Sequence, residues 1–276
     1  MSTTFAYERK DVLLDVEGVS ITRGGVPVLR DVHARIRDVV RPGMQQGQIV
    51  GLLGPSGVGK TTLFKILAGL LRPDTGSVRI GAAGLPATPG LVGVVAQNYV
   101  LFEHRTVLGN LVIAARQAGR PAAEARSQSM HYLERFGLAE HADRFPMQLS
   151  GGQRQRVAIA QQLLCSEHYL VMDEPFSGLD VLAQERVQEL LVEVCTRHEH
   201  NTLILVTHDV SAAVAVSDTI WLMGRERDAA GNVVPGARIL GEIDLVERDL
   251  AWHPDIRGRK GYQELVNEIK ARFHTL

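Results

Sequence analysis

The fold of this chain is constrained most by four short apolar runs: IVGLL at 49–53, VGVVA at 92–96, YLVM at 169–172 and LILVT at 203–207. The apolar residues are continuous in these runs and do not alternate with polar ones. This pattern is typical of strands buried on both faces, as in a parallel sheet covered by helices. The chain has 276 residues, 45% of them hydrophobic, which is enough to form one large core or two small ones. We therefore predict an α/β fold.

A polar group or a glycine-rich loop follows each run. GPSGVGKTT follows the first, Gln97 the second, Asp173 and Glu174 the third, and His208 the fourth. In an open parallel sheet, ligands bind beyond the carboxyl ends of the strands. We therefore expect these four segments to meet at one edge of the sheet.

The remaining segments suggest additions to this α/β core. Alternation and turn signals in residues 11–36 predict a small antiparallel sheet, and residues 98–163 predict an inserted helical subdomain. TIWLM at 219–223 is expected to be a strand, residues 224–240 a strand pair around a loop, and residues 262–273 a helix. Residues 38–46 and 228–235 are expected to be exposed loops. We divide the chain into a domain at 1–224 and an extension, a β-hairpin plus a helix, at 225–276.

Composition narrows the classes of function. Thirty basic and 31 acidic residues give a net charge of −1, which is not the global charge of a nucleic-acid-binding protein. We expect no nucleic-acid partner, no secretory signal and no membrane span. Two cysteines are too few for a disulfide framework. Cys195, His198 and His200 form at best a weak candidate metal cluster, since no fourth ligand is evident.

Residues 54–61, GPSGVGKT, match the phosphate-binding loop pattern, with a strand before the loop and a helix after it. Its backbone amides can surround phosphate oxygens. Lys60 can reach the β- and γ-phosphates, and the hydroxyl of Thr61 can bind Mg²⁺. The motif predicts a P-loop NTPase core whose nucleotide contacts are Gly54, Pro55, Ser56, Gly57, Val58, Gly59, Lys60, Thr61 and Thr62.

The acidic pair after the third run suits phosphoryl chemistry. Asp173 can bind Mg²⁺ directly or through water, and Glu174 can activate the attacking water. The alternative is two surface acids at a turn before Pro175. His208 and Gln97 are weaker signals individually, since a lone histidine after a strand is more often structural. Convergence on the same edge favours a contact with the γ-phosphate.

LSGGQRQRVAIAQQLL, residues 149–164, places Ser150, Gly151 and Gly152 at the entrance of an amphipathic helix. Ser150 followed by Gln153 is a capping box, which needs no function beyond pairing the first helical amides. Alternatively, the bare glycines leave those amides open to a phosphate at the positive end of the helix dipole.

From about Leu13 to Met223 the sequence resembles the nucleotide-binding subunits of ATP-binding cassette transporters. The resemblance depends on GPSGVGKTT, Gln97, LSGGQRQR, YLVMDEP, SGLD ending in Asp180, and His208, in that order. It implies ATP and Mg²⁺ as cofactors, with Thr61, Gln97 and Asp173 on the metal side. It further implies that Glu174 is the general base, that His208 contacts the γ-phosphate and that Gln97 senses metal and water.

The same resemblance implies a head-to-tail dimer. Ser150, Gly151, Gly152 and Gln153 would contact ATP held by a second cassette, and Asp180 would bridge the two subunits. Both sets of half-site motifs are complete, so a homodimer is the simpler expectation, although a paired cassette subunit is an alternative. Separate membrane subunits would be contacted through residues 99–104, with Tyr99, Phe102 and His104 as candidates, and their alternative is packing within the helical subdomain.

Two features refine the resemblance. SITRGG offers Arg23 where the family usually places an aromatic residue against adenine, and a guanidinium can stack there instead. The C-terminal stretch is loosely similar to subunits for nitrate, sulfonate or taurine uptake. FPMQLSGGQRQR followed by DEPFSGLD resembles importer subunits more than exporters. We therefore expect a transport ATPase on the cytoplasmic face of the cell membrane that drives import. The alternatives are an exporter subunit, a soluble ATPase that acts on nucleic acid or the ribosome, and a regulatory module without turnover.

Overall fold

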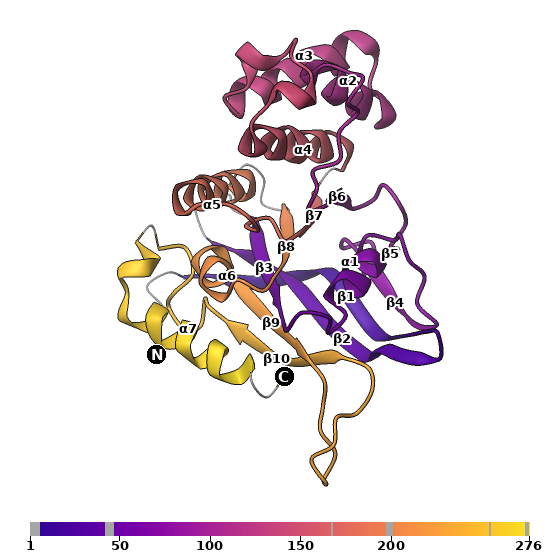
Figure 1. Ribbon diagram of the computed structural model, residues 1–276, viewed down its shortest axis with the longest axis vertical. Helices are drawn as coiled ribbons and strands as arrows, with labels where there is room; N and C mark the ends of the chain where they lie inside the picture. Colours follow the sequence, from indigo (N-terminus) through magenta and orange to yellow (C-terminus); the bar gives the residue numbers. More distant parts are fainter. Residues whose placement is uncertain (1–5, 42–46, 167, 197–200, 254, 274–275) are drawn as a thin grey trace.

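The computed structural model describes residues 6–41, 47–166, 168–196, 201–253, 255–273 and 276. It contains two sheets and a helical subdomain (Figure 1). The strands are β1 (Glu8–Arg23), β2 (Val26–Val40), β3 (Gln48–Leu53), β4 (Thr75–Ile80), β5 (Leu85–Pro86), β6 (Gly93–Val95), β7 (Tyr169–Asp173), β8 (Thr202–Thr207), β9 (Thr219–Gly224) and β10 (Arg238–Asp244). The α-helices are α1 (Lys60–Leu67), α2 (Val107–Gln117), α3 (Ala122–Arg135), α4 (Gly151–Cys165), α5 (Val181–Cys195), α6 (Val210–Val216) and α7 (Lys260–Phe273). Three short 3-10 turns are η1 (Ala139–His141), η2 (Pro146–Gln148) and η3 (Ile256–Gly258).

The larger sheet has the strand order β10-β9-β3-β8-β7-β6. All neighbouring pairs from β9 to β6 are parallel, and β10 pairs antiparallel with β9 at one edge. The four apolar runs thus form β3, β6, β7 and β8, as predicted. Along β8, Leu203 and Leu205 enter one hydrophobic cluster while Ile204 and Val206 enter another, which is why the run is continuously apolar.

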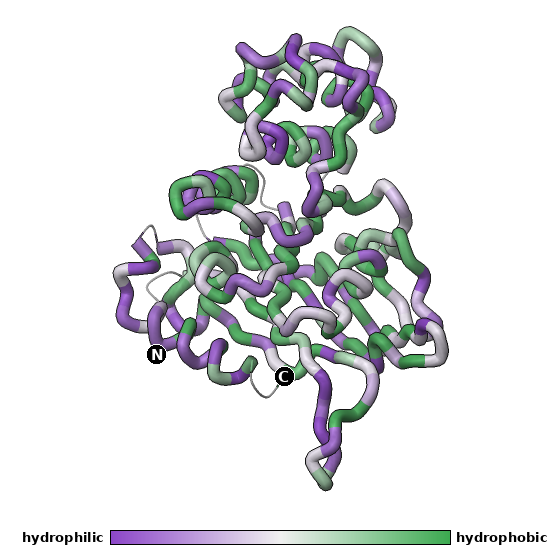
Figure 2. Tube along the Cα trace, in the orientation of Figure 1, coloured by the Kyte–Doolittle hydropathy of each residue, from purple (hydrophilic) through white to green (hydrophobic). Residues whose placement is uncertain are grey.

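The smaller sheet is antiparallel and has the order β2-β1-β4-β5, which confirms the sheet predicted from residues 11–36. Its buried face shares a core with α1 and the centre of the larger sheet. The helical subdomain is also confirmed: α2 and α3 lie beyond α4 at one end of the molecule (Figure 1). Hydrophobic residues run through the α/β body, whereas hydrophilic residues alternate with them along the peripheral helices α3 and α7 (Figure 2).

Two predictions for the connecting segments need correction. Residues 38–40 are not part of a loop but extend β2, where Asp38 is buried; residues 42–46 lie outside the described part of the chain. The strand pair predicted around the loop in 224–240 is present as β9 and β10, but it lies mostly outside that range: antiparallel pairing starts at Gly224 and Arg238 and runs away from the loop, and nearer the loop Arg227 and Val233 form an isolated bridge. The apolar residues Ile239 and Ile243 of β10 complete cores formed by other elements.

The prediction of an exposed loop at 228–235 is correct. Asp228 closes this loop by accepting hydrogen bonds from the amides of Ala230 and Asn232, both at 2.9 Å. The predicted C-terminal helix is α7, whose buried side chains Tyr262, Leu265, Val266 and Ile269 pack in a third cluster with α6 and the β10 edge.

Candidate active site

The phosphate-binding loop connects β3 to α1, and glycine is required in it for two reasons. Gly57 and Gly59 have φ angles of 75° and 117°, which L side chains rarely adopt. At Gly54 the obstacle is space, because a β-carbon there would lie 2.5 Å from the carbonyl oxygen of Met223. The loop therefore keeps its backbone accessible and in a conformation that few other sequences can reach.

Lys60 is the first residue of α1, and its side chain folds back over the loop. Nζ donates to the carbonyl oxygens of Gly54 at 2.7 Å and Pro55 at 3.1 Å. Burial lowers the pKa of Lys60, while the nearby carboxylates of Glu174 and Asp173 raise it. The ammonium group thus lies beside the acidic pair at the carboxyl edge of the sheet.

The amino-terminal end of α1 is suited to an anion. Its N-cap, Gly59, supplies no side chain to pair the first amides, and the first turn contains no acidic residue. Exposed amides and the positive end of the helix dipole favour negative charge at such an end. Thr61 is exposed in the same turn.

Glu174 is held at the end of β7 by contacts with the next strand. Oε2 accepts a hydrogen bond from Thr207 Oγ1 at 2.9 Å, and Oε1 lies 2.8 Å from His208 Nδ1. Its backbone has a φ angle of 49°, uncommon for a residue other than glycine. The Glu174 amide donates to the carbonyl of Val206 at 2.8 Å, so both backbone and side chain are fixed to β8.

Asp173 lies beside Glu174 in a partly buried position. Burial is the main factor that raises the pKa of Asp173; the charge of Glu174 raises it further, whereas Lys60 and Lys65 lower it. Two adjacent carboxylates with limited access to water fit a divalent cation, which would offset their mutual repulsion. Asp173 and Thr61 carry oxygen donors of the kind that Mg²⁺ prefers.

Gln97 follows β6 and reaches the loop after Glu174, donating from Nε2 to Ser177 Oγ at 3.3 Å. It therefore lies on the same edge as the acidic pair. Tyr99 has a φ angle of 46° and is half-buried, with Oη 3.5 Å from the carbonyl oxygen of Pro175. Burial raises the pKa of Tyr99.

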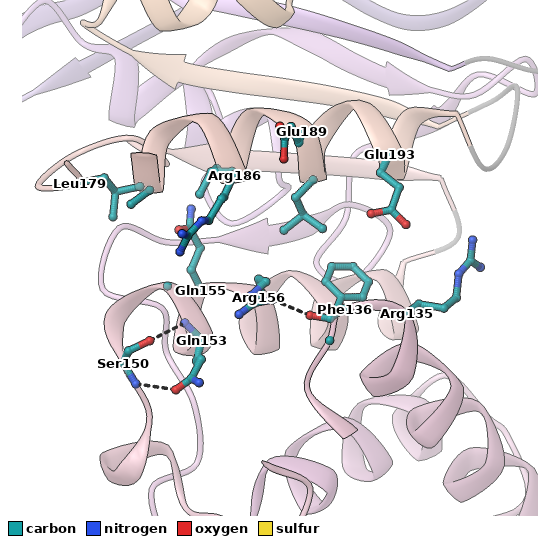
Figure 3. A pocket seen from close by; sticks show the side chains of 15 residues that line it. Arg135, Phe136, Ser150, Gln153, Gln155, Arg156, Leu179, Arg186, Glu189 and Glu193 are labelled. Carbon is teal, nitrogen blue, oxygen red and sulfur yellow. Dashed lines mark hydrogen bonds between the residues drawn. The ribbon is translucent and has the colours of Figure 1, made fainter. Parts of the chain in front are cut away.

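The capping box predicted at the start of α4 is present. Ser150 Oγ accepts from the Gln153 amide at 3.3 Å, and Gln153 Oε1 accepts from the Ser150 amide at 2.9 Å (Figure 3). A β-carbon placed on Gly151 or Gly152 would meet nothing within 4 Å, so their backbone faces open space. Capping by Ser150 therefore coexists with an accessible helix end. Gln153 Nε2 also lies 2.7 Å from His141 Nε2.

A pocket of about 390 Å³ separates α4 from α5 (Figure 3). Asp180 caps α5 by accepting a hydrogen bond from the Ala183 amide at 2.9 Å. Arg156 crosses toward α3 and donates to the Phe136 carbonyl at 2.7 Å. Burial lowers the pKa of Arg156, and the nearby charge of Arg186 lowers it further.

Two further predictions concern residues at the surface: Arg23 as the residue that stacks on the base, and residues 99–104 as the contact with membrane subunits. Arg23 is exposed at the end of β1, and β2 of the same hairpin approaches the phosphate loop, since a β-carbon on Gly59 would lie 3.3 Å from Val28 Cγ1. Phe102 is 44% exposed and packs edge-on against the exposed His104. Tyr99 is half-buried and its ring packs against the core, which favours the packing alternative for this residue.

Sequence reasoning missed several residues of this site. Thr207 binds Glu174, and its position directly before His208 at the end of a strand could have indicated it. Arg225 Nη2 lies 3.5 Å from the Gly57 carbonyl, and Gln155 reaches the Pro175 carbonyl; neither contact has a local sequence signal.

The candidate metal cluster can be described only in part. Cys195 is buried, and His198 and His200 lie outside the described residues. No group of three potential metal ligands of the His, Cys, Asp or Glu type occurs among the residues that the structure describes.

A search of the helices in the described ranges finds none that is both long enough and apolar enough to cross a membrane.

Two solved structures share this fold. One is described as "Structure of cbiO1 from clostridium perfringens: Part of the ABC transporter complex cbiONQ", with a TM-score of 0.72 and 24% identity over 96% of this chain and 99% of that one. The other is a "Structure of ATP binding subunit of ABC transporter", with a TM-score of 0.68 and 26% identity over 94% of this chain and 99% of that one.

Named relatives are more similar in sequence. The "Sulfate/thiosulfate import ATP-binding protein CysA" of Gloeobacter violaceus is 40% identical over 95% of this chain and 75% of its own length. The "Methionine import ATP-binding protein MetN" of Caulobacter vibrioides is 35% identical over 86% and 73%. The "Fe(3+) ions import ATP-binding protein FbpC" of Agrobacterium fabrum is 41% identical over 79% of this chain, which spans only 60% of that relative.

A profile of the family described as "ABC transporter" matches residues 38–177, which include the phosphate loop, Gln97, LSGGQ and the acidic pair. With this match and relatives at 35% and 40% identity over most of both chains, the protein belongs to the ABC transporter family.

Proposed function

We propose that this chain is the ATP-hydrolysing subunit of an ABC importer for a small solute. The observation that supports this best is the arrangement around Glu174: its carboxylate is fixed by Thr207 and His208 at the sheet edge where Lys60 covers the phosphate loop. A fixed carboxylate beside a phosphate cradle suits the activation of water for attack on a γ-phosphate.

The residues divide the reaction among them. The loop amides and Lys60 bind the β- and γ-phosphates, for which Nζ exchanges its bonds to Gly54 and Pro55. Glu174 takes the proton of the attacking water as the water oxygen bonds to the γ-phosphorus and the bond to the ADP oxygen breaks. His208 contacts Glu174 through Nδ1, and with a hydrogen on both ring nitrogens it can donate from Nε2 to the γ-phosphate. Thr61, Gln97 and Asp173 are the proposed ligands of Mg²⁺, which neutralises the phosphate charge when bound.

The second half of each site comes from a partner cassette. The open amides at Gly151 and Gly152 fit the γ-phosphate of an ATP molecule bound by a second copy, with Ser150, Gln153 and Asp180 at the same interface. Since one chain carries both half-sites, we propose a homodimer that ATP holds together and hydrolysis releases.

The proposed role in transport is based on the names of the relatives. They are named for the import of sulfate or thiosulfate, methionine and Fe(3+) ions. We propose that the subunit drives import of a small solute from the cytoplasmic face of the membrane and contacts separate membrane subunits through Phe102 and His104. Assignment to nitrate, sulfonate or taurine uptake remains a prediction from the C-terminal resemblance, because these three relatives are named for other solutes.

Arg23 is proposed to stack on the nucleotide base. Stacking contributes about 1–3 kcal/mol for each base and tolerates different bases. Comparable hydrolysis of GTP and ATP is therefore expected. A strict preference for ATP would contradict this role.

The central experiment compares wild-type protein with Glu174→Gln. We expect the wild type to hydrolyse ATP and the variant to lose at least about 99% of this activity, because the proton acceptor is removed. The variant should accumulate a dimer in light scattering when ATP is added, but not when ADP is added. The proposed mechanism would be contradicted if Glu174→Gln hydrolysed ATP at the wild-type rate and stayed monomeric when ATP was added.

A second experiment separates transport from the other functions. Tagged protein is purified with its partners from gently solubilised membranes of its own source. A multi-span membrane protein in stoichiometric amount supports the transporter assignment. Ribosomal proteins or nucleic acid without a membrane partner would favour the alternative of a soluble ATPase.

A further inference from the structure

Gln155 is a fully buried polar residue in the first turns of α4, the helix that begins with the open Gly151 and Gly152. Its Nε2 donates to the carbonyl oxygen of Pro175 at 2.8 Å. Tyr99 Oη lies 3.5 Å from the same oxygen. One carbonyl thus joins α4, the segment after Gln97 and the loop after β7.

The position of this carbonyl matters because Pro175 directly follows Glu174. Glu174 has a left-handed backbone conformation that must be held by its surroundings. On its strand side the Glu174 amide bonds to Val206, and within the loop its carbonyl accepts from the Ser177 amide at 3.1 Å. The hydrogen bond from Gln155 to the Pro175 carbonyl holds the peptide group that follows Pro175. Together, these three hydrogen bonds restrain the backbone on both sides of Glu174, the proposed general base.

A glutamine at this position is less favourable than an apolar residue would be, because one of its two amide atoms has no partner. Its Oε1 is buried without a hydrogen-bond partner within the described structure. An apolar side chain of similar length would fill the space without leaving a polar atom unpaired. The useful half of this amide is therefore the donor directed at Pro175.

The pocket beside Gln155 also reaches the entrance of α4. The contact between Gln155 and Pro175 therefore lies between that entrance and the loop that follows Glu174. Gln155 lines the space between α4 and α5 and projects from α4 toward α5 (Figure 3). The same pocket extends to Ser150, Gly152 and Gln153 at the helix entrance. A shift of α4 that accompanies a ligand at this entrance would be carried by Gln155 to the loop of Glu174.

We propose that Gln155 is a positioning residue for Glu174 and links occupancy of the α4 entrance to the orientation of the general base. The inference rests on the proposed ATPase function. It assigns to Gln155 no contact with the nucleotide and no proton transfer. Its loss should therefore slow hydrolysis without weakening the binding of ATP.

The test replaces Gln155 with Met, which preserves length and packing but removes the donor. Gln161→Met is the matched control, because Gln161 is also a buried glutamine and lies farther along α4. We expect Gln155→Met to lower kcat about tenfold, while the KM for ATP and the nucleotide-binding affinity stay within about twofold of wild type. The control should retain wild-type kcat.

Two further variants keep the proposal falsifiable if Gln155→Met does not fold. Gln155→Glu retains the shape and polarity but offers only acceptor oxygens to Pro175, and we expect the same loss of kcat. Tyr99→Phe removes the longer bond to the same carbonyl and should add a smaller loss when combined with either change. In a Glu174→Gln background, replacing Gln155 should have no additional effect, because the residue acts through Glu174.

The outcomes distinguish this inference from the proposed function. If wild type hydrolyses ATP, Glu174→Gln is inactive and both Gln155 variants retain wild-type kcat, the positioning role is wrong and the ATPase assignment stands. A rise in KM equal to the fall in kcat/KM would also overturn it, since Gln155 would then serve binding. If the wild type and Glu174→Gln are equally inactive, both proposals fail.

Discussion

The carboxylate of Glu174 and the imidazole of His208 lie 2.8 Å apart, Oε1 to Nδ1, although 34 positions separate them in the chain. Because an ionised carboxylate can only accept, His208 Nδ1 carries the hydrogen in this contact. Thr207, the neighbour of His208, donates to the other oxygen of Glu174. Two consecutive residues of β8 and its following loop thus orient one acidic group, and the first prediction concerns this arrangement.

Replacing Thr207 with Val removes the donor to Glu174 Oε2 while nearly preserving the shape of the side chain. We expect kcat to fall about fivefold to tenfold with little change in the KM for ATP, because the base loses orientation while the phosphate loop is intact. Steady-state ATPase measurements check this. Thr207→Ser restores the hydroxyl, including its bond from the Asp209 amide, and should recover most of the rate.

Replacing Lys60 with Met should abolish stabilisation by nucleotide. Wild-type protein at an ATP concentration of 100 times Kd should gain about 2.7 kcal/mol, seen as a rise of several degrees in Tm. The ligand-free Tm should change little, because the hydrogen bonds lost by the ammonium offset relief of its burial. Lys65→Met, an exposed lysine in the last turn of α1, is the matched control. An ATP-induced shift of wild-type size in Lys60→Met would contradict the assigned role.

Two substitutions of Ser150 separate capping from ligand binding. Ser150→Ala loses the side-chain acceptor of the Gln153 amide, which should destabilise the fold by about 1 kcal/mol and also weaken the ATP-dependent dimer. Ser150→Asp keeps a good N-cap and hence the Tm, but its charge repels an incoming phosphate. Thermal melts and light scattering with ATP, both in a Glu174→Gln background, provide the comparison. A stable dimer of the Ser150→Asp variant would leave Ser150 with a capping role alone.

Asp218 predicts a pH dependence of stability. Burial raises the pKa of Asp218 from 3.8 to about 7, although the Ile49 amide, bonded to Oδ2 at 2.6 Å, and the charge of Arg41 lower it. Between these pH values the folded protein retains a proton that the unfolded chain has released, so the contribution of Asp218 to stability falls as pH rises toward and through 7.

Replacing Asp218 with Asn keeps an acceptor for the Ile49 amide and removes the titration. The Tm of the variant relative to wild type should therefore increase from pH 5 to pH 8 and then level off. Thermal unfolding followed by circular dichroism across this range measures the difference. A Tm difference independent of pH would show that the proton on Asp218 does not contribute.

Much of this site could be predicted from the sequence because its signals are local. GPSGVGKT requires positive φ angles and open amides within a few residues, and the Ser150–Gln153 capping box closes within one helical turn. Continuous apolar runs identified four strands buried on both faces, and their order along the chain indicated which polar residues would share an edge.

Only the tertiary structure decided which distant groups meet. The sequence alone contained no signal that Gln155 and Tyr99 converge on Pro175, that Tyr99 turns inward, or that β10 completes the larger sheet beside β9. Local patterns report burial and the hydrogen bonds that a segment forms with itself. A contact between segments depends on the packing of all the elements around it, and no short stretch of sequence contains that information.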